Sequence, residues 1–145
     1  MEKRFRVCFT SDLHGFLFPT DYRGREEKEL GLFKCANRFG KDGNTLVIDG
    51  GDLLQGSPLG TYCHDTLDDP RCFAQVMDRC GYDFVTLGNH DFNYGMDYLG
   101  RYLDPLHARC VCQNLVREDG STPFPFRVHR LENGLRVGIV GLVTD

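Results

Sequence analysis

The stretch TLVIDGGD, residues 45–52, is an apolar strand that runs directly into two glycines and an aspartate. Two other stretches have the same arrangement: RFRVCFT at 4–10 leads into Asp-Leu-His-Gly, and FVTLGNHD at 84–91 ends in Asn-His-Asp. Short β-prone runs bounded by glycine and polar residues predict strands. Because these runs are almost continuously apolar, we expect a sheet that is covered on both faces.

Helical patterns separate these strands. Apolar residues recur at helical spacing over 30–39, 70–81 and 96–103, and Gly81 is expected to end the second of these helices. Residues 53–70 are interpreted as a long loop in which His64 is solvated.

The remaining residues predict further strands. A fourth strand is expected over 109–115, and the runs 124–131 and 135–144 flank Asn133-Gly134, a strong hairpin signal. Strands therefore alternate with helices along most of the chain. This order predicts a layered α/β fold.

The composition excludes some classes of function. The chain has 145 residues, enough for one domain with a core of its own, and its net charge is -4. A protein that binds a nucleic-acid polymer needs a basic surface, which this balance does not provide. Single nucleotides remain candidate substrates, because a metal site can supply positive charge. No stretch approaches the roughly 18 apolar residues of a membrane span, so no membrane partner is expected.

The cysteines are interpreted as free thiols. There are seven, an odd number, and no CxxC pair indicates a zinc ribbon or a thioredoxin-like site. Cys110 and Cys112 are two residues apart, which places both on one face of a strand and favours core packing. The basic N-terminus is not followed by the apolar segment of a signal peptide. Free thiols without a signal peptide predict a cytoplasmic protein.

Acidic, histidine and asparagine side chains gather at the three strand ends. Asp12 and His14 alternate with Leu13, so in extended backbone both point the same way. Asp52 has two oxygens that can bridge two ions, and Asn89 offers an amide oxygen. Ligands of open α/β sheets bind beyond the carboxyl ends of the strands. Mixed nitrogen and oxygen donors suit Mn, Fe, Zn or Co.

Each motif alone also has a structural interpretation. Asp12 can cap a turn, His14 can lie at the surface, and Gly-Asp after a strand is common. Asn89-His90-Asp91 after a buried strand is more specific, because it has little structural purpose. The three motifs together, each at a strand end, favour a metal site.

The motifs DLH, GGD and GNHD resemble those of calcineurin-like metallophosphoesterases. The segments GDLLQGSPLGTY and GNHDFNYG are similar to the branch of 5'-nucleotidases and 2',3'-cyclic-nucleotide 2'-phosphodiesterases. The resemblance implies a sheet sandwich flanked by helices, and a hydrolase of nucleotide catabolism that uses two divalent metal ions (Mn, Zn, Fe or Co). A general phosphodiesterase of the same superfamily is the alternative.

The resemblance also implies roles for individual residues. Asp12 and His14 would bind the first ion, Asp52 would bridge both ions, and Asn89 would bind the second ion and reach a phosphate oxygen. His90 would act as a general acid or stabilise the transition state. Many 5'-nucleotidases carry an aspartate three residues after this histidine. Here that residue is Asn93, as in the cyclic phosphodiesterase group, and an amide stabilises an imidazolium less than a carboxylate does.

The sequence departs from the family pattern in its later part. The family takes further metal ligands from a lone histidine and a Gly-His-x-His motif, whereas His107 and His129 lack this context and are not expected to bind metal. We therefore expect residues 1–145 to be the N-terminal part of a catalytic domain, without the C-terminal metal-ligand motifs and the nucleotide-binding domain. The chain alone is expected to have little activity. A non-catalytic metal-binding fragment or assembly module is the alternative, and an exposed sheet edge predicts self-association.

Overall fold

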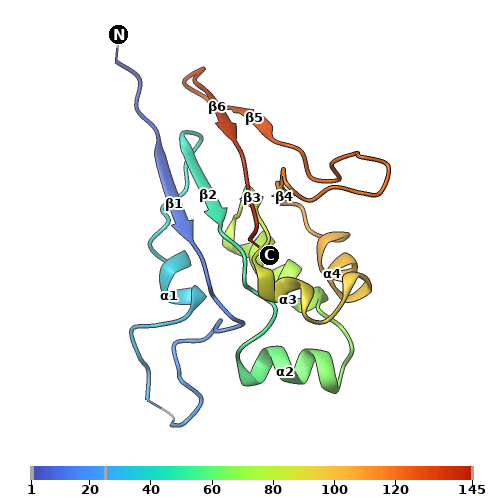
Figure 1. Cartoon of the computed structure of the whole chain (residues 1–145). Coiled ribbons are helices and arrows are strands. Elements are labelled where there is room, and N and C mark those ends of the chain that lie inside the picture. Colours follow the sequence, from blue (N-terminus) through green and yellow to red (C-terminus); the bar gives the residue numbers. More distant parts are fainter. Residues whose placement is uncertain (1, 25, 145) are drawn as a thin grey trace.

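The computed structural model describes residues 2–24 and 26–144. Its main sheet has four parallel strands in the order β1-β2-β3-β4, which are Arg6–Thr10, Thr45–Asp49, Phe84–Val85 and Arg109–Cys110. Asp49 pairs with both Thr10 and Val85, so the first three strands end level with one another. The strands β5 (Arg127–Arg130) and β6 (Arg136–Ile139) form a separate antiparallel hairpin (Figure 1).

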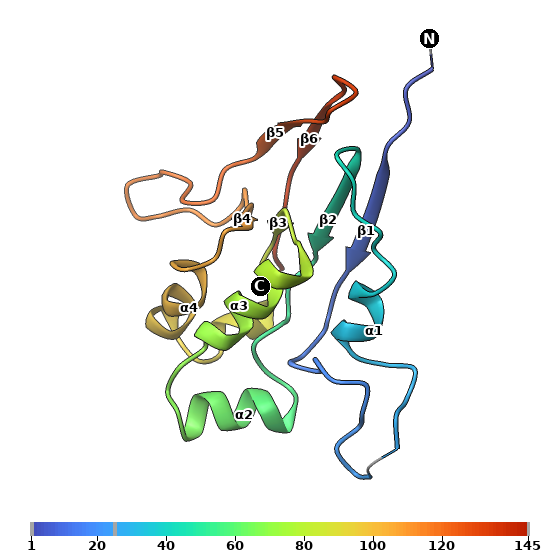
Figure 2. The ribbon, with the colours of Figure 1, turned by 180° about the vertical axis from the view of Figure 1, so that it is seen from behind.

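The helices connect the parallel strands. They are α1 (Leu32–Ala36), α2 (Pro58–Asp65), α3 (Arg71–Cys80), the 3-10 helix η1 (Asn89–Phe92) and α4 (Met96–Leu103). Figure 2 shows α1, α3 and α4 on the side of the sheet opposite to the β5–β6 hairpin. The predicted α/β fold is confirmed, and the crossovers bring the carboxyl ends of β1, β2 and β3 to one edge.

Alternate side chains along the strands pack into two separate hydrophobic cores, one on each face of the sheet. Val47 and Val85 are buried with the helices, in the larger core. Leu46 and Phe84 point to the other face, where they pack with Leu131 and Ile139 of the hairpin region. This alternation follows from the two-residue period of a strand. The molecule therefore has three layers: helices, the parallel sheet, and the hairpin.

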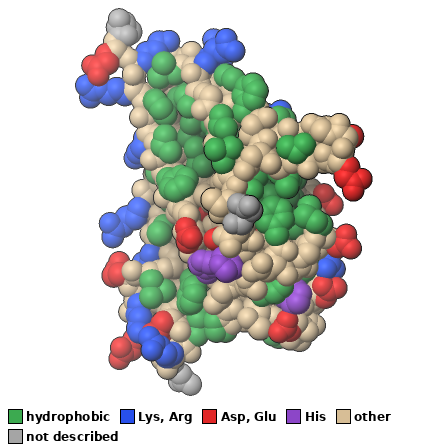
Figure 3. Space-filling view, in the orientation of Figure 1, with side chains coloured by type: hydrophobic (Ala, Val, Ile, Leu, Met, Phe, Trp, Pro, Cys, Tyr) green, Lys and Arg blue, Asp and Glu red, His purple; other side chains and the backbone are tan. Residues whose placement is uncertain are grey.

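The first strand is covered on one face only. Cys8 packs against the helical core, whereas Val7 is 47% exposed and Phe9 is 63% exposed. In Figure 3 hydrophobic side chains gather on the upper half of the molecule, where the strands lie. The expectation that both faces of the sheet are covered is therefore wrong for β1, because the hairpin extends over β2, β3 and β4 only.

The segment 53–70 is not one long loop. Pro58–Asp65 form α2, whose first turn is capped by Ser57: its Oγ accepts a hydrogen bond from the Gly60 amide at 3.1 Å. Serine before proline is a helix-start signal, and it outweighs the weak apolar periodicity here. His64 therefore lies on a helix and stacks on the Tyr94 ring, with ring centroids 3.8 Å apart, so its solvated-loop interpretation is also wrong.

Most other elements agree with the expectation, but several are shorter. The helices predicted over 70–81 and 96–103 are α3 and α4, and the hairpin is confirmed. The helix expected over 30–39 is only Leu32–Ala36, and the strands expected over 84–91 and 109–115 keep only two paired residues each. None of the helices formed by the described residues has the length and apolar character needed to cross a membrane.

Candidate metal centre

Three chain segments meet beyond the carboxyl ends of β1, β2 and β3. The Asp12 amide donates to the Gly51 carbonyl at 2.9 Å, and the His14 amide donates to the Asp52 carbonyl at 2.8 Å. The loop after β1 therefore lies along the loop after β2. Polar side chains that are distant in the sequence become neighbours at this edge.

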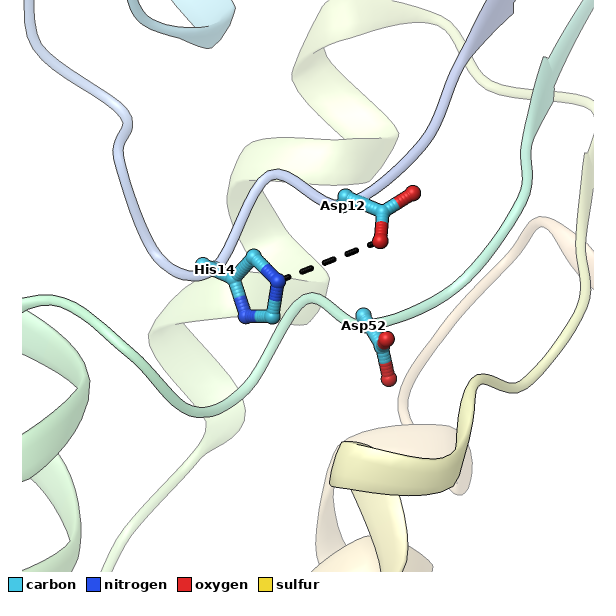
Figure 4. A group of neighbouring side chains, drawn as sticks. All are labelled: Asp12, His14 and Asp52. Atoms are coloured by element: carbon cyan, nitrogen blue, oxygen red, sulfur yellow. Dashed lines mark ion pairs between the residues drawn. The ribbon is translucent and has the colours of Figure 1, made fainter. Parts of the chain in front are cut away.

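Asp12, His14 and Asp52 form a compact group. Each offers one ligand atom, and these atoms all lie within 4.8 Å of one another. His14 Nε2 is 3.9 Å from Asp12 Oδ1 (Figure 4). The Asp12 side chain is 65% exposed, whereas Asp52 is largely buried. The group is thus open to solvent on one side and backed by protein on the other.

All three residues have a left-handed backbone. The φ angles are 54° at Asp12, 48° at His14 and 57° at Asp52. This conformation costs an L-residue with a Cβ roughly 1–2 kcal/mol. Strained residues persist where the surrounding structure holds them, and they concentrate at functional sites. Here the left-handed backbone directs the three side chains toward one another.

The main chain orients the His14 ring. His14 Nδ1 lies 2.7 Å from the carbonyl oxygen of Gln55, which can only accept a hydrogen bond. The proton of the neutral ring therefore lies on Nδ1, and the lone pair of Nε2 faces the carboxylates. Metal-binding histidines are commonly held in this way by a carbonyl behind the ring.

Close backbone approach explains two glycines. A Cβ on Gly51 would lie 2.2 Å from the Gly88 amide nitrogen, and Gly51 has a φ of 94°. A Cβ on Gly88 would lie 2.1 Å from Asp52 Oδ1. Neither position has room for a side chain. The two loops can therefore touch only where both residues are glycine.

Asp91 joins the loops after β2 and β3. Its buried carboxylate accepts four backbone hydrogen bonds, from Asp52 at 2.8 Å, Leu53 at 3.0 Å, Leu54 at 3.1 Å and Gly88 at 3.0 Å. Burial raises the pKa of Asp91, and these four donors counteract that shift. Asp91 thus positions Asp52.

Asp49 lies behind the group and is almost completely buried. Thr10 Oγ1 donates to Asp49 Oδ2 at 2.6 Å, the Gly51 amide donates to Oδ1 at 3.0 Å, and the Tyr82 hydroxyl lies 2.6 Å from Thr10 Oγ1. Burial raises the pKa of Asp49 to about 7. Asp49 is therefore partly protonated near neutral pH, unlike an exposed aspartate.

His90 lies beside the group, at the start of η1. Its amide donates to Asp52 Oδ1 at 2.8 Å, and its ring is edge-on to the His14 ring with centroids 5.3 Å apart. His90 Nδ1 is 3.0 Å from Gln55 Oε1 and 3.1 Å from Asn93 Nδ2. Gln55 thus contacts both histidines, through its carbonyl oxygen and its side chain.

Asn89 precedes His90, and its side chain is exposed. It lines an open pocket of about 540 Å³ together with Phe92, Asn93, Asn114, Val143 and Thr144. Asn93, which lines this pocket, also contacts His90, so the pocket lies next to His90. Space for a ligand therefore exists next to the acidic group.

The other histidines considered from the sequence lie elsewhere. His107 pairs with Asp78 at 3.3 Å, and its side chain is 91% exposed. His129 lies on β5 with its ring against Phe84. Neither belongs to the Asp12–His14–Asp52 group. Among residues 2–24 and 26–144, no Lys or Arg forms an ion pair with Asp12 or Asp52, so their negative charge remains for a cation.

Sequence patterns alone did not identify two residues that organise the site. Asp91 is the third residue of η1, where an acidic side chain can accept from the backbone at the helix start, so its role has a local signal. Gln55 has no such local signal, because its contacts to His14 and His90 join segments that are 41 and 35 residues apart.

Comparison with known proteins finds similar sequences along nearly the whole chain. The sequence model described as calcineurin-like phosphoesterase matches residues 5–135. The chain is 34% identical to the trifunctional nucleotide phosphoesterase protein YfkN of Bacillus subtilis, over 94% of this chain. It is 35% identical to the 2',3'-cyclic-nucleotide 2'-phosphodiesterase/3'-nucleotidase of Salmonella typhimurium, over 95% of this chain.

A solved structure shares the fold. The crystal structure of the calcineurin-like phosphoesterase YfkN superposes with a TM-score of 0.75 and 30% identity, and the match covers 94% of this chain and 47% of that one. The curated relatives are much longer: the match spans 11% of the Bacillus protein and 24% of the Salmonella protein.

Proposed function

Since this chain belongs to the calcineurin-like phosphoesterase family, we propose that it is the N-terminal part of the catalytic domain of an enzyme that hydrolyses phosphate esters of nucleotides. The observation that carries this proposal is the convergence of Asp12, His14 and Asp52 at the carboxyl edge of the sheet, with His90 beside them. These residues come from three separate loops, and neither carboxylate has a Lys or Arg partner among the described residues.

The donor set fits a divalent metal ion. Two carboxylates and one imidazole nitrogen offer the mixed oxygen and nitrogen ligation that suits Mn, Zn, Fe or Co. In this proposal Asp12, His14 and Asp52 would hold one ion, and Asn89 together with Asp52 would hold another. Asp52 Oδ1 already accepts the His90 amide, which leaves Oδ2 without a protein donor among the described residues.

Bound metal ions of this kind lower the pKa of water and neutralise charge on phosphoryl oxygens. The protein residues then have separate tasks. His90 would assist departure of the leaving oxygen, as a general acid or by stabilising the transition state, and general-acid assistance contributes typically about 10²–10⁴-fold. Gln55 Oε1 accepts from His90 Nδ1 and so orients the ring, with Asn93 beside it.

The proposed substrates are 5'-nucleotides or 2',3'-cyclic nucleotides. The relatives are named as nucleotide phosphoesterase and as 2',3'-cyclic-nucleotide 2'-phosphodiesterase/3'-nucleotidase. Asn93, which replaces the aspartate of many 5'-nucleotidases, favours the cyclic nucleotides of the two. The pocket beside Asn89 has room for part of such a substrate. A general phosphodiesterase activity of the same superfamily is the alternative.

We also propose that further metal ligands and a nucleotide-binding domain belong to sequence beyond these 145 residues. The described histidines other than His14 and His90 do not reach the group, and the relatives are several times longer. The exposed Val7 and Phe9 on the edge strand β1 offer an apolar surface for additional strands or for a second copy of the chain. Seven free cysteines favour a cytoplasmic location.

The test separates metal binding from turnover. Mn²⁺ binding to the metal-free chain is measured by calorimetry for the wild type, for Asp52→Asn, and for Asp97→Asn as a control on an exposed aspartate of α4. We expect the affinity to fall at least about tenfold in Asp52→Asn, because one charged ligand is lost, and to stay unchanged in Asp97→Asn. Equal affinity in all three proteins would refute the metal centre.

Turnover of 5'-AMP and of 2',3'-cyclic AMP is then followed by chromatography with Mn²⁺ present. We expect slow or undetectable hydrolysis by the isolated chain, despite measurable Mn²⁺ binding. Fast hydrolysis that Asp52→Asn abolishes would show that these residues, or two copies of the chain, complete the site. That result would also exclude the alternative of a non-catalytic metal-binding fragment.

A further inference from the structure

Two thiols from neighbouring helices lie in contact. Cys63, near the end of α2, and Cys72, in the first turn of α3, have their sulfur atoms 3.5 Å apart. Both are free cysteines. No other pair of thiols among residues 2–24 and 26–144 forms a hydrogen bond. Formation of a disulfide requires the two sulfur atoms to approach to about 2.05 Å.

The backbone between the two thiols is held in place. The Asp69 amide donates to the Cys63 carbonyl at 3.0 Å, and the Asp69 carboxylate pairs with the Arg71 guanidinium at 2.7 Å. Asp68 pairs with Arg101 of α4 at 2.7 Å, which ties the connection to a third helix. The short distance between the sulfurs is therefore a property of the packed helices and not of a free loop.

The two thiols differ in exposure. Cys63 is almost completely buried in the helical core, whereas Cys72 is exposed. Burial raises the pKa of the Cys63 thiol to about 12, so it remains protonated in neutral solution. A reagent from solution therefore meets Cys72 first, and Cys63 lies directly behind it.

We propose that Cys63 and Cys72 form a covalent modification site, a dithiol that a small-molecule disulfide of the glutathione type oxidises to an intramolecular disulfide. Attack by the Cys72 thiolate breaks the sulfur–sulfur bond of the reagent, forms a mixed disulfide and releases one small thiolate. Cys63 then attacks the Cys72 sulfur, the bond between Cys72 and the reagent's sulfur breaks, and the Cys63 proton passes to the leaving sulfur, which departs as the second small thiol. Two protein thiols are oxidised, and one small disulfide is reduced to two thiols.

The new bond would cross-link α2 to α3. It closes a loop of about ten residues, which restricts the unfolded chain and stabilises the native state. The other end of α2 follows Gln55, the residue that orients His14 and His90. The modification thus acts on the scaffold of the metal centre without consuming any of its proposed ligands.

The test uses the reduced chain and oxidised glutathione. Trypsin cleaves after Lys41, Arg71 and Arg79, so Cys63 and Cys72 fall into separate peptides, 42–71 and 72–79. We expect the wild type to lose two thiols, to give these two peptides joined by a reducible bond, and to carry no glutathione on either. The oxidised chain should also have a Tm higher by on the order of 5–10 °C than the reduced chain.

Three variants complete the test. Cys63→Ser should stop at the first step and keep glutathione on Cys72, and Cys72→Ser should leave Cys63 unmodified. Cys35→Ser, which removes an exposed thiol of α1, should still form the link. Because Cys72 is exposed, its serine variant is not expected to unfold the protein. Glutathione that persists on Cys72 of the wild type, or a link that forms only through other cysteines, would overturn the proposal.

Discussion

Four aspartates lie at or behind the candidate metal centre, and they differ in the groups that surround their carboxylates. Asp12 and Asp52 have no Lys or Arg partner among the described residues and are available to a cation. Asp91 receives four backbone N–H donors. Asp49 is buried with only a hydroxyl and one amide, so its pKa rises to about 7. At this site, aspartates therefore have different roles: Asp91 positions the loops, Asp49 binds a proton, and Asp12 and Asp52 are the proposed metal ligands.

Asp49 should make stability depend on pH. In the unfolded chain its pKa is near 3.8, and in the fold it is about 7, so unfolding between these values releases a proton. The contribution of Asp49 to stability is thus full below pH 4 and is lost as the pH rises through 7. We expect the free energy of unfolding of the wild type to fall relative to Asp49→Asn by about 1.4 kcal/mol per pH unit in this window.

Urea unfolding of the metal-free wild type and of Asp49→Asn between pH 4.5 and 8 measures the difference between their free energies of unfolding. Asparagine keeps the acceptor for Gly51 and can donate to Thr10, so it imitates the protonated acid. Asp97→Asn serves as the control and should follow the wild type at every pH, because Asp97 is exposed. Parallel curves for wild type and Asp49→Asn would show that Asp49 is ionised throughout.

At the scale of the elements, helix ends decide where the chain turns toward the site. α3 buries Phe73, Ala74 and Met77 against the core and ends at Gly81, whose φ is 81°. This left-handed residue turns the chain into β3, whose end leads to Asn89 and His90. α4 also contains a glycine, Gly100, but there the backbone is helical and a Cβ would meet nothing within 4 Å.

The two glycines should therefore respond in opposite ways to alanine. Gly81→Ala places a Cβ in the left-handed region and is expected to destabilise the protein by about 1–2 kcal/mol. Gly100→Ala improves helix propensity in open space and is expected to stabilise it by up to about 1 kcal/mol. Urea unfolding at one pH measures both. A stabilising Gly81→Ala would contradict the left-handed end of α3.

At the scale of the whole molecule, the two cores are unequal. The helices cover one face of all four strands, although Cys8 of β1 is only partly buried, and the β5–β6 hairpin leaves β1 uncovered on the other face. The uncovered part lies over the edge strand β1, with Val7 and Phe9 exposed. An apolar edge strand is a common route to association between chains.

The double variant Val7→Thr/Phe9→Thr should reduce the self-association proposed for this surface. Threonine keeps the β propensity, so we expect the free energy of unfolding to change by less than about 1 kcal/mol. Sedimentation over a series of concentrations should show wild-type oligomers that the double variant lacks. Leu67→Thr, at an exposed apolar residue after α2, is the control and should associate like the wild type. A wild type that is monomeric at every concentration would contradict the expectation.

The sequence by itself determined the α/β order and the strand-end placement of Asp12, His14, Asp52, Asn89 and His90. These features depend on local signals: apolar runs, glycine turns and motif spacing, all of which are readable within a few residues. The same local reasoning missed α2, because its start signal, Ser57-Pro58, is short and only sparse apolar periodicity follows it.

Only the tertiary structure decided which distant groups meet. Some of these contacts join segments that are distant in the sequence: Gln55 with His14 and His90, Asp91 with its four backbone donors, and Cys63 with Cys72. The exposed face of β1 depends instead on how far the hairpin covers the sheet. Long-range packing determines these contacts. It cannot be inferred from the periodicity of the sequence, because the local pattern around each residue is compatible with many different tertiary partners.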